Sequence, residues 1–314
     1  MTLAFDLILC LMIIGTAASA LLMRNALAAI VFFIVFGNLL GLAWLAMDAV
    51  NVAMAEIAIG AGVTGVLLIL ARQRLMALGD DLVCDEMPGW LRAGALVACA
   101  GFAALVGAAV LSVAPSDDLG GPIAALMPSL GIENPVTGVL LAFRAYDTLL
   151  ETFVLLGALV AVWSLAPGTA WPHPPATLAL TEREGHGVAA AFGRLLLPLA
   201  LVMAAYLVWT GSDLPGGAFQ AGTVLAGGLI IAVIGGAVLW PRGDNRLLRV
   251  ALVLGPAVFL TIGLAGIALG RFLFYPPGFE KALIVAIEYS LALSIGVTLA
   301  LQLAGPPVTP DHKG

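Results

Sequence analysis

The sequence predicts an all-α fold, a polytopic bundle of about nine transmembrane helices, and three observations support this. Of the 314 residues, 62% are hydrophobic and only 10% are charged, whereas soluble domains carry about 25% charged residues. The mean hydropathy of +1.11 leaves too few polar residues to cover a soluble surface. The apolar runs are as long as the ~20 residues that cross a bilayer, and few Gly-Pro breaks interrupt them, which favours helices over barrel strands.

The predicted spans are joined by short turns at first and by longer loops later. No basic segment precedes the first apolar run and further spans follow it, so it is interpreted as a membrane helix and not as a cleaved signal. The nine spans are 3–23, 26–47, 50–70, 93–113, 136–165, 189–209, 218–239, 247–269 and 283–303. Polar loops at 72–90 and 167–187 divide them into three expected modules, at 1–80, 81–170 and 187–305.

The distribution of lysine and arginine predicts the orientation in the membrane. If the N-terminus faces outward, ten of the 13 basic residues fall on the inner side. Only Arg271 and Lys281 fall on the outer side, and Arg144 lies within a span. We therefore expect a multi-pass protein of the cell (inner) membrane, with its N-terminus outside and its C-terminus in the cytoplasm.

Several functional classes are disfavoured by what the sequence lacks. The three cysteines are scattered without metal-ligand spacing, and the three histidines fall in loops or in the tail. No HExxH, GxSxG or phosphate-loop pattern occurs, and no basic stretch suggests nucleic acid. The expected protein is therefore not an enzyme and holds no metal, no cofactor and no nucleic acid.

Charged groups at membrane depth are costly unless paired or neutralised, so their default interpretation is functional. Glu56 lies in the outer half of the third span and is followed by Gly60, Gly62 and Gly65. Glycines allow helices to approach closely, and they allow a kink or a π-bulge. A carboxylate beside such a segment is suited to bind a cation or to exchange a proton. The alternative is a glutamate that only bonds a neighbouring helix.

A second group of charges lies in the fifth span. Arg144, Asp147 and Glu151 are spaced by three and four residues, so they share one helix face. Arg144 is expected to pair with Asp147, which leaves Glu151 as the better candidate to titrate. A continuous helix would place the two acids about 17 to 23 Å into the span, near mid-membrane. The alternative is a purely structural ion cluster.

Two further features lie in the last block of spans. Pro215, Gly216 and Gly217 demand a tight turn, with Asp213 on the outer rim. This segment fits either an ion entrance or a plain hairpin between spans. Glu288 lies in the outer half of the last span, where a proton relay and a structural role have equal weight.

These segments, taken in order, resemble a known series of membrane modules. The third span, AMDAVNVAMAEIAIGAGVTGVLLILA, resembles the D-type module of membrane-bound hydrogenases. That module is also part of the C-terminal extension of the large A-type protein in multi-subunit Mrp-type Na+/H+ antiporters, and it is similar to early helices of the J-type protein in complex I. The string RAYDTLLE resembles the E-type hydrogenase module that follows it. The last block resembles the B-type protein of Mrp antiporters, with the hairpin signature carried by Pro215, Gly216, Gly217, Phe219 and Gln220.

The resemblance implies a function and several site residues. Glu56 matches a membrane acid of the sodium or proton path, and Asp147 and Glu151 match the acidic pair of the E-like module. Ala218 and Ala221 replace glycines that the family often has in the hairpin. No lysine lies inside any predicted span, in contrast to the long antiporter-like module of the Mrp A-type protein, so other antiporter subunits are implied as partners.

The expected function is therefore a membrane subunit of an Mrp-type cation/proton antiporter, with an ion path of Glu56, Arg144, Asp147, Glu151 and Glu288. Sodium ions or protons are the expected cargo, and the lipid bilayer is the solvent. The alternatives are a subunit of a redox-driven complex I-like or hydrogenase assembly, and a purely structural scaffold. A free-standing transporter ranks behind these.

Overall fold

The computed structural model describes residues 3–77, 88–113, 120–165, 188–239 and 243–307. All of its described secondary-structure elements are helices, which confirms the predicted fold class. Eight helices are long and apolar enough to cross a membrane, and a bent pair makes nine if it counts as one span. The chain is thus a multi-pass membrane protein.

The first module, residues 3–77, contains three spans. They are α1 (Leu3–Leu22), α2 (Ala26–Ala46) and a compound helix of α3 (Val50–Ala55), the π-helix η1 (Glu56–Val63) and α4 (Thr64–Ala77). Small residues let α2 lie directly against η1: a Cβ on Gly37 would come within 2.9 Å of the Ala61 Cβ. The distortion expected beside Glu56 is confirmed, because the π-helix begins at that residue.

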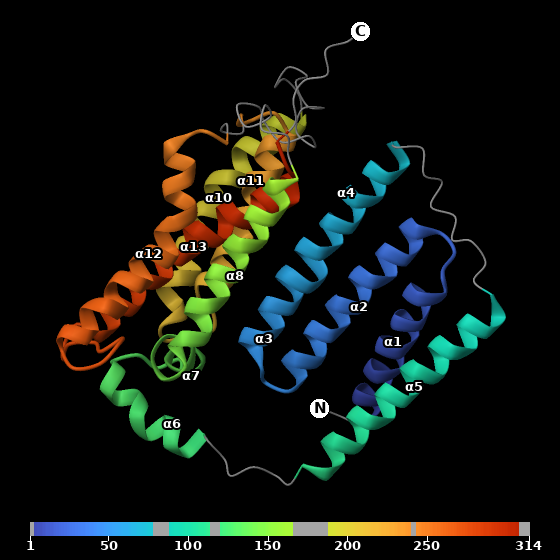
Figure 1. Cartoon of the computed structure of the whole chain (residues 1–314), viewed down its shortest axis with the longest axis horizontal. Coiled ribbons are helices and arrows are strands. Elements are labelled where there is room, and N and C mark those ends of the chain that lie inside the picture. Colours follow the sequence, from blue (N-terminus) through green and yellow to red (C-terminus); the bar gives the residue numbers. More distant parts are fainter. Residues whose placement is uncertain (1–2, 78–87, 114–119, 166–187, 240–242, 308–314) are drawn as a thin grey trace.

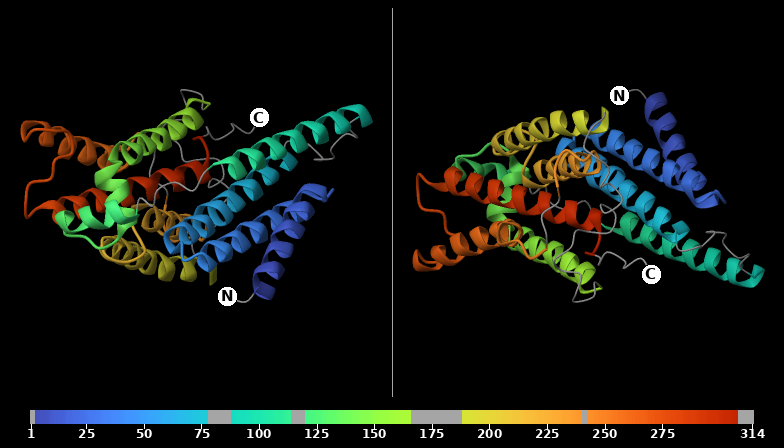
Figure 2. Two further views of the ribbon diagram at one scale, coloured as in Figure 1. Left: turned by 90° about the horizontal axis from the view of Figure 1, so that it is seen from below. Right: turned by 90° about the horizontal axis from the view of Figure 1, so that it is seen from above.

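The second module, residues 89–164, is irregular. It consists of α5 (Gly89–Ser112), α6 (Gly120–Leu126), the 3-10 helix η2 (Met127–Leu130), α7 (Pro135–Gly138), the π-helix η3 (Val139–Phe143) and α8 (Ala145–Ser164). The segments 120–130 and 135–143 meet at 83°. Helix α5 has no buried residue, and both views in Figure 2 show it extending beyond the other helices at one end.

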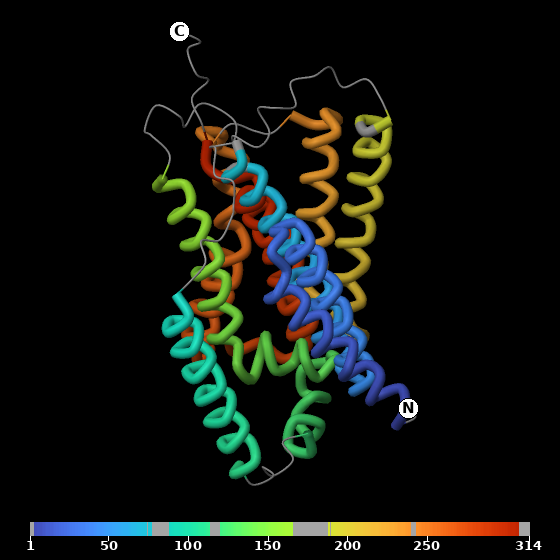
Figure 3. The backbone as a smooth tube through the Cα atoms, turned by 90° about the vertical axis from the view of Figure 1, so that its right-hand side faces the viewer, coloured from blue at the N-terminus to red at the C-terminus, as the bar shows by residue number. Residues whose placement is uncertain are grey.

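The prediction of one continuous span at 136–165 is wrong. The helix breaks at Arg144, where φ is −126° and ψ is 35°, and Figure 3 shows the preceding segment running across the lower end of α8. Side chains satisfy two carbonyls of the irregular turn: the Thr148 hydroxyl donates to Leu140 O at 2.7 Å, and the Tyr275 hydroxyl donates to Leu141 O at 2.6 Å. Asp147 therefore lies in the first turn of α8, and the predicted depth of 17 to 23 Å along an unbroken helix does not hold.

The third module, residues 188–304, is a four-helix bundle. Its helices are α10 (Val188–Gly211), α11 (Ala218–Ile234), α12 (Arg246–Ala268) and α13 (Glu280–Ala304). Helix α11 has 17 residues and is shorter than the predicted span. Helix α13 is the most buried of the described spans. Figure 1 shows it among α8, α10, α11 and α12, with the helices of the first module beside this bundle.

Candidate ion site between the three modules

The turn between α10 and α11, residues 212–217, is the tight hairpin that its sequence predicts. Gly217 has φ +124°, a conformation that residues with a side chain rarely adopt. A Cβ on Gly216 would lie only 2.5 Å from Leu207 O. The Gly217 N–H donates to the same carbonyl at 3.0 Å, which closes the turn against the end of α10.

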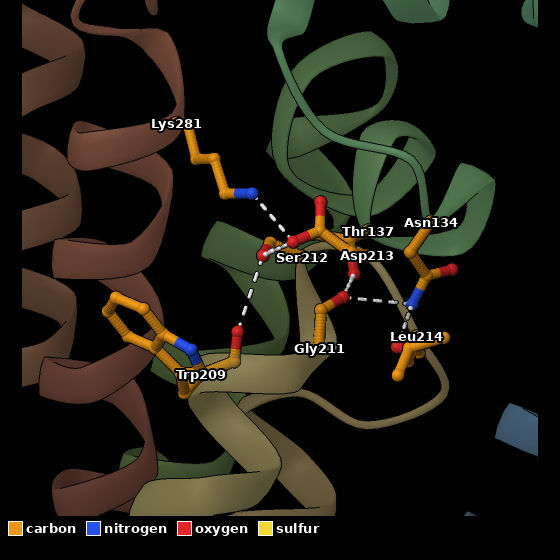
Figure 4. A network of polar contacts seen from close by, with 8 residues as sticks. All are labelled: Asn134, Thr137, Trp209, Gly211, Ser212, Asp213, Leu214 and Lys281. Atoms are coloured by element: carbon orange, nitrogen blue, oxygen red, sulfur yellow. Dashed lines mark hydrogen bonds and ion pairs between the residues drawn. The ribbon is translucent and has the colours of Figure 1, made fainter.

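The second module holds this hairpin through buried hydrogen bonds (Figure 4). The Asn134 side-chain amide donates to Gly211 O and to Leu214 O, both at 2.9 Å. The Thr137 hydroxyl donates to Gly211 O at 2.6 Å. These donors satisfy carbonyls at the end of α10 that have no partner within the helix.

The first module reaches the same hairpin through one residue. The Asn51 side-chain oxygen accepts the Gly216 N–H at 2.9 Å, and the Gln220 side-chain amide donates to Asn51 O at 3.3 Å. The hairpin is therefore the point at which all three modules meet.

An ion pair closes the outer edge of the hairpin. Lys281 Nζ lies 2.6 Å from Asp213 Oδ2, and the Ser212 hydroxyl donates to the same oxygen at 3.1 Å. Burial raises the pKa of the Asp213 carboxyl, but the hydrogen bonds from Lys281 and Ser212 and the lysine charge outweigh it, so its pKa lies below the ordinary value. Asp213 is thus held as a carboxylate at neutral pH.

A cavity of about 290 Å³ lies where the three modules meet, and the turn of the hairpin forms part of its wall. Its polar lining consists of Asn51 from the first module, Thr137, Thr148 and Glu151 from the second, and Gln220 and Glu288 from the third. Among the described residues, no lysine or arginine lines it. The cavity thus contains two carboxyl groups and no described basic side chain to neutralise them.

Glu288 is the most enclosed acid of this cavity. Only 4% of its surface is exposed, and its carboxyl faces the backbone N–H of Ala218, the first residue of α11. The positive end of that helix dipole therefore lies beside it. Its second oxygen, Oε2, is buried without a hydrogen-bond partner.

Glu151 lies at the edge of the cavity. The neighbouring threonines of α8, Thr148 and Thr152, are buried, whereas Glu151 is exposed on the surface of the single chain. It therefore connects the cavity with a surface that other subunits or lipid would cover.

The other predicted site residues lie outside the cavity lining. Arg144 pairs with Asp147 at 2.6 Å, as expected, but both side chains are largely exposed, at 71% and 53%. Glu56 folds back against Gly60 of its own π-helix, where a Cβ would collide with its carboxyl group. Its neighbours Ala55 and Ile59 line the cavity, and Glu56 itself does not.

Three contributors to the site were missed in the sequence: Asn51, Asn134 and Thr137. All three lie near the start of a helix, and Asn134 also caps α7 by accepting the Val136 N–H at 3.1 Å. Asparagine and threonine are common at helix starts for this capping role alone. Their long-range contacts therefore carry no distinct sequence signal.

The fold and the cavity define a multi-pass membrane protein in which three helical modules meet at one polar site. Residues 188–304 match the family model described as a domain related to the MnhB subunit of Na+/H+ antiporter. Residues 11–77 match the MbhD model, whose description names the D component of MBH. The chain therefore joins an MnhB-related domain and an MbhD domain in one polypeptide, which confirms the resemblance seen in these two segments.

Similar proteins extend this picture. An uncharacterized protein of Methanocaldococcus jannaschii is 31% identical over 156 residues, which are 45% of this chain and 59% of that protein. The structure of the Mrp complex from Dietzia sp. DQ12-45-1b contains a chain with the same fold, with a TM-score of 0.73 and 21% identity, over 97% of this chain and 35% of that one. The present chain thus spans less than two thirds of the length of either.

A structure of the membrane-bound sulfane sulfur reductase, an archaeal respiratory membrane complex, is also similar. The TM-score is 0.55 at 20% identity, over 68% of this chain and 98% of that chain.

Proposed function

We propose that this chain is a membrane subunit of an Mrp-type cation/proton antiporter and contributes part of an intramembrane path for sodium ions or protons. The MnhB-related and MbhD domains support the assignment to this type of assembly. The observation that carries the ion path is the cavity between the modules, with two carboxyl groups and no described basic residue in its lining.

The physical argument is one of charge balance. A carboxylate in a low-dielectric interior is costly unless a cation or a proton neutralises it. Because no described lysine or arginine lines the cavity, a mobile cation or proton must supply the positive charge. Glu288 and Glu151 are therefore the central residues of the proposed path.

The remaining acids extend this path toward its neighbours. Glu56 lies beside the cavity on a π-helix, a geometry that frequently marks functional sites. Asp147 is held by Arg144 and is assigned to shape the local field and not to carry the ion.

The proposed partners are the other membrane subunits of the antiporter, including those of the proton-pumping type. Helix α5 carries large exposed apolar residues along its length, such as Leu96, Phe102 and Leu111. In a membrane, only lipid or other helices can cover such a surface. The purified chain alone is therefore not expected to exchange ions.

Ion flux in vesicles that contain the assembled complex tests this proposal. We expect Glu151→Gln to reduce sodium-driven proton movement strongly, with the complex still assembled. Glu280→Gln is a matched control, because that carboxyl bonds the Gly278 N–H outside the cavity. Unchanged flux from fully assembled Glu151→Gln and Glu56→Gln complexes would contradict the path.

A redox-driven assembly of the hydrogenase or complex I type is the second candidate. The MbhD domain and the similarity to the sulfane sulfur reductase complex favour it. The subunits that co-purify with the tagged chain decide between the two. Iron–sulfur subunits would indicate the redox assembly, and antiporter subunits alone would indicate the first proposal.

A further inference from the structure

We infer that the cavity holds one dehydrated monovalent cation between the carboxylate of Glu288 and the side-chain oxygen of Gln220, beside Gly217. This inference rests on the proposed function for the identity of the ion as sodium. It goes further in naming a discrete binding site, its ligands and the reason for the glycine.

The geometry at Gly217 brings two oxygens to one place. A Cβ on this residue would lie 3.0 Å from Glu288 Oε1 and 3.4 Å from Gln220 Oε1. Both oxygens therefore border the space that the missing side chain leaves open. A larger residue at this position would occupy that space as well as strain the backbone.

The orientation of the Gln220 amide follows from its other contact. Its nitrogen donates to Asn51 O at 3.3 Å, and a backbone carbonyl can only accept. The amide oxygen is therefore the end that faces Gly217 and Glu288. Two acceptors thus face the same space, and a positive charge between them would satisfy both.

The remaining oxygen of Glu288 supports the same conclusion. Oε2 is buried and has no hydrogen-bond partner, and a buried ionised oxygen without a partner is strongly disfavoured. The residue also lines a cavity with room for an ion and its remaining water ligands. A bound cation satisfies this orphaned atom without any movement of the fold.

The charge of the site selects a monovalent ion. Oxygen-only ligand sets suit hard cations. Calcium takes six to eight oxygens and magnesium retains an octahedral shell, whereas here one carboxylate supplies one compensating charge. A proton on Glu288 would neutralise the same group, so sodium and the proton are expected to exclude each other at this position.

The site is tested on the assembled complex through its sodium-dependent thermal stability, because a ligand that binds only the folded state raises the midpoint of unfolding. Midpoints are compared in sodium chloride and in choline chloride at equal ionic strength. We expect sodium to raise the midpoint of the wild type, Glu288→Gln to abolish the shift, and Glu280→Gln to retain it. Gln220→Met, which keeps the size of the side chain, should need about tenfold more sodium for the same shift.

Competition with protons gives a second readout. Where Glu288 is mostly protonated, each unit of falling pH should raise the sodium concentration at half-effect up to about tenfold. A sodium shift that persists undiminished in both Glu288→Gln and Gln220→Met overturns the site, as does a wild-type complex without any sodium shift. If Glu288→Gln does not assemble, the Gln220→Met result decides alone.

Flux measurements on the same samples separate the two proposals. Active exchange by a wild-type complex that shows no sodium shift overturns the site and leaves the proposed function standing. A sodium shift that requires Glu288 in a complex without exchange supports the site and contradicts the proposed function.

Discussion

The start of α8 and the start of α11 both place acidic side chains at membrane depth, but they treat them differently. At α8, Asp147 is paired with Arg144 at 2.6 Å and both side chains are exposed on the single chain. At α11, Glu288 is 4% exposed and has an oxygen without a partner. An acid in an apolar span is thus a candidate for ion binding when its environment leaves the charge uncompensated, and not because of its position in the sequence alone.

The largest effect on stability is expected where the modules meet, at Asn134. Asn134→Ala removes donors to Gly211 O and Leu214 O, and leaves those buried carbonyls unsatisfied. We expect a loss of about 2–3 kcal/mol in the free energy of unfolding, measured by denaturation in detergent. Asn38→Ala is the control, because that amide bonds only Ile34 O at an exposed site; equal losses in both variants would contradict the role of the hairpin as the junction.

A smaller effect is expected at Tyr275, which supports the second π-helix. Its buried hydroxyl donates to Leu141 O at 2.6 Å, and Tyr275→Phe leaves that carbonyl without this donor. The expected loss is about 1–2 kcal/mol. Tyr206→Phe, at a largely exposed position, should change stability by less than about 0.5 kcal/mol.

The Asp213–Lys281 pair should give a small dependence of stability on pH. The folded-state pKa of Asp213 is lowered, so its contribution is present above the unfolded value of about 3.9. It is lost as the pH falls through the folded pKa. Because the pair is partly exposed, we expect less than ~1 kcal/mol. The unfolding midpoints of wild type and Asp213→Asn should therefore differ at pH 7 and converge near pH 3, and a constant difference would exclude this linkage.

The smallest effect in the isolated chain is expected for the exposed pair at α8. A double-mutant cycle with Arg144→Gln and Asp147→Asn should give a coupling of about 0–1 kcal/mol in detergent. The same cycle in the assembled complex sharpens the comparison. A coupling that grows on assembly would show that a partner covers this face and converts an exposed pair into a buried one.

Much of the fold could be predicted from local sequence, because it depends on local physics. The length of the apolar runs set the spans, the Pro-Gly-Gly sequence set the hairpin, and the spacing of three set the Arg144–Asp147 pair. The π-helix at Glu56 was among the distortions that its glycines suggested.

The parts that could not be predicted depend on contacts between distant segments. Nothing in the residue type of Arg144 breaks a helix, and hydroxyls from Thr148 and from the remote Tyr275 satisfy the irregular turn. The cavity likewise depends on how Asn51, Glu151 and Glu288 converge from three modules. Sequence patterns within each module carry no information on that arrangement.

The central claim is that the uncompensated acid, and not the paired one, holds the transported ion. Its most direct test is sodium-driven proton flux in vesicles with assembled Glu288→Gln and Asp147→Asn complexes, measured at matched protein content. Loss of the counter-charge in the cavity should cost more than the ~1.4 kcal/mol that corresponds to a tenfold change. We therefore predict at least a tenfold loss of flux for Glu288→Gln and a clearly smaller loss for Asp147→Asn. Undiminished flux in an assembled Glu288→Gln complex would contradict the account.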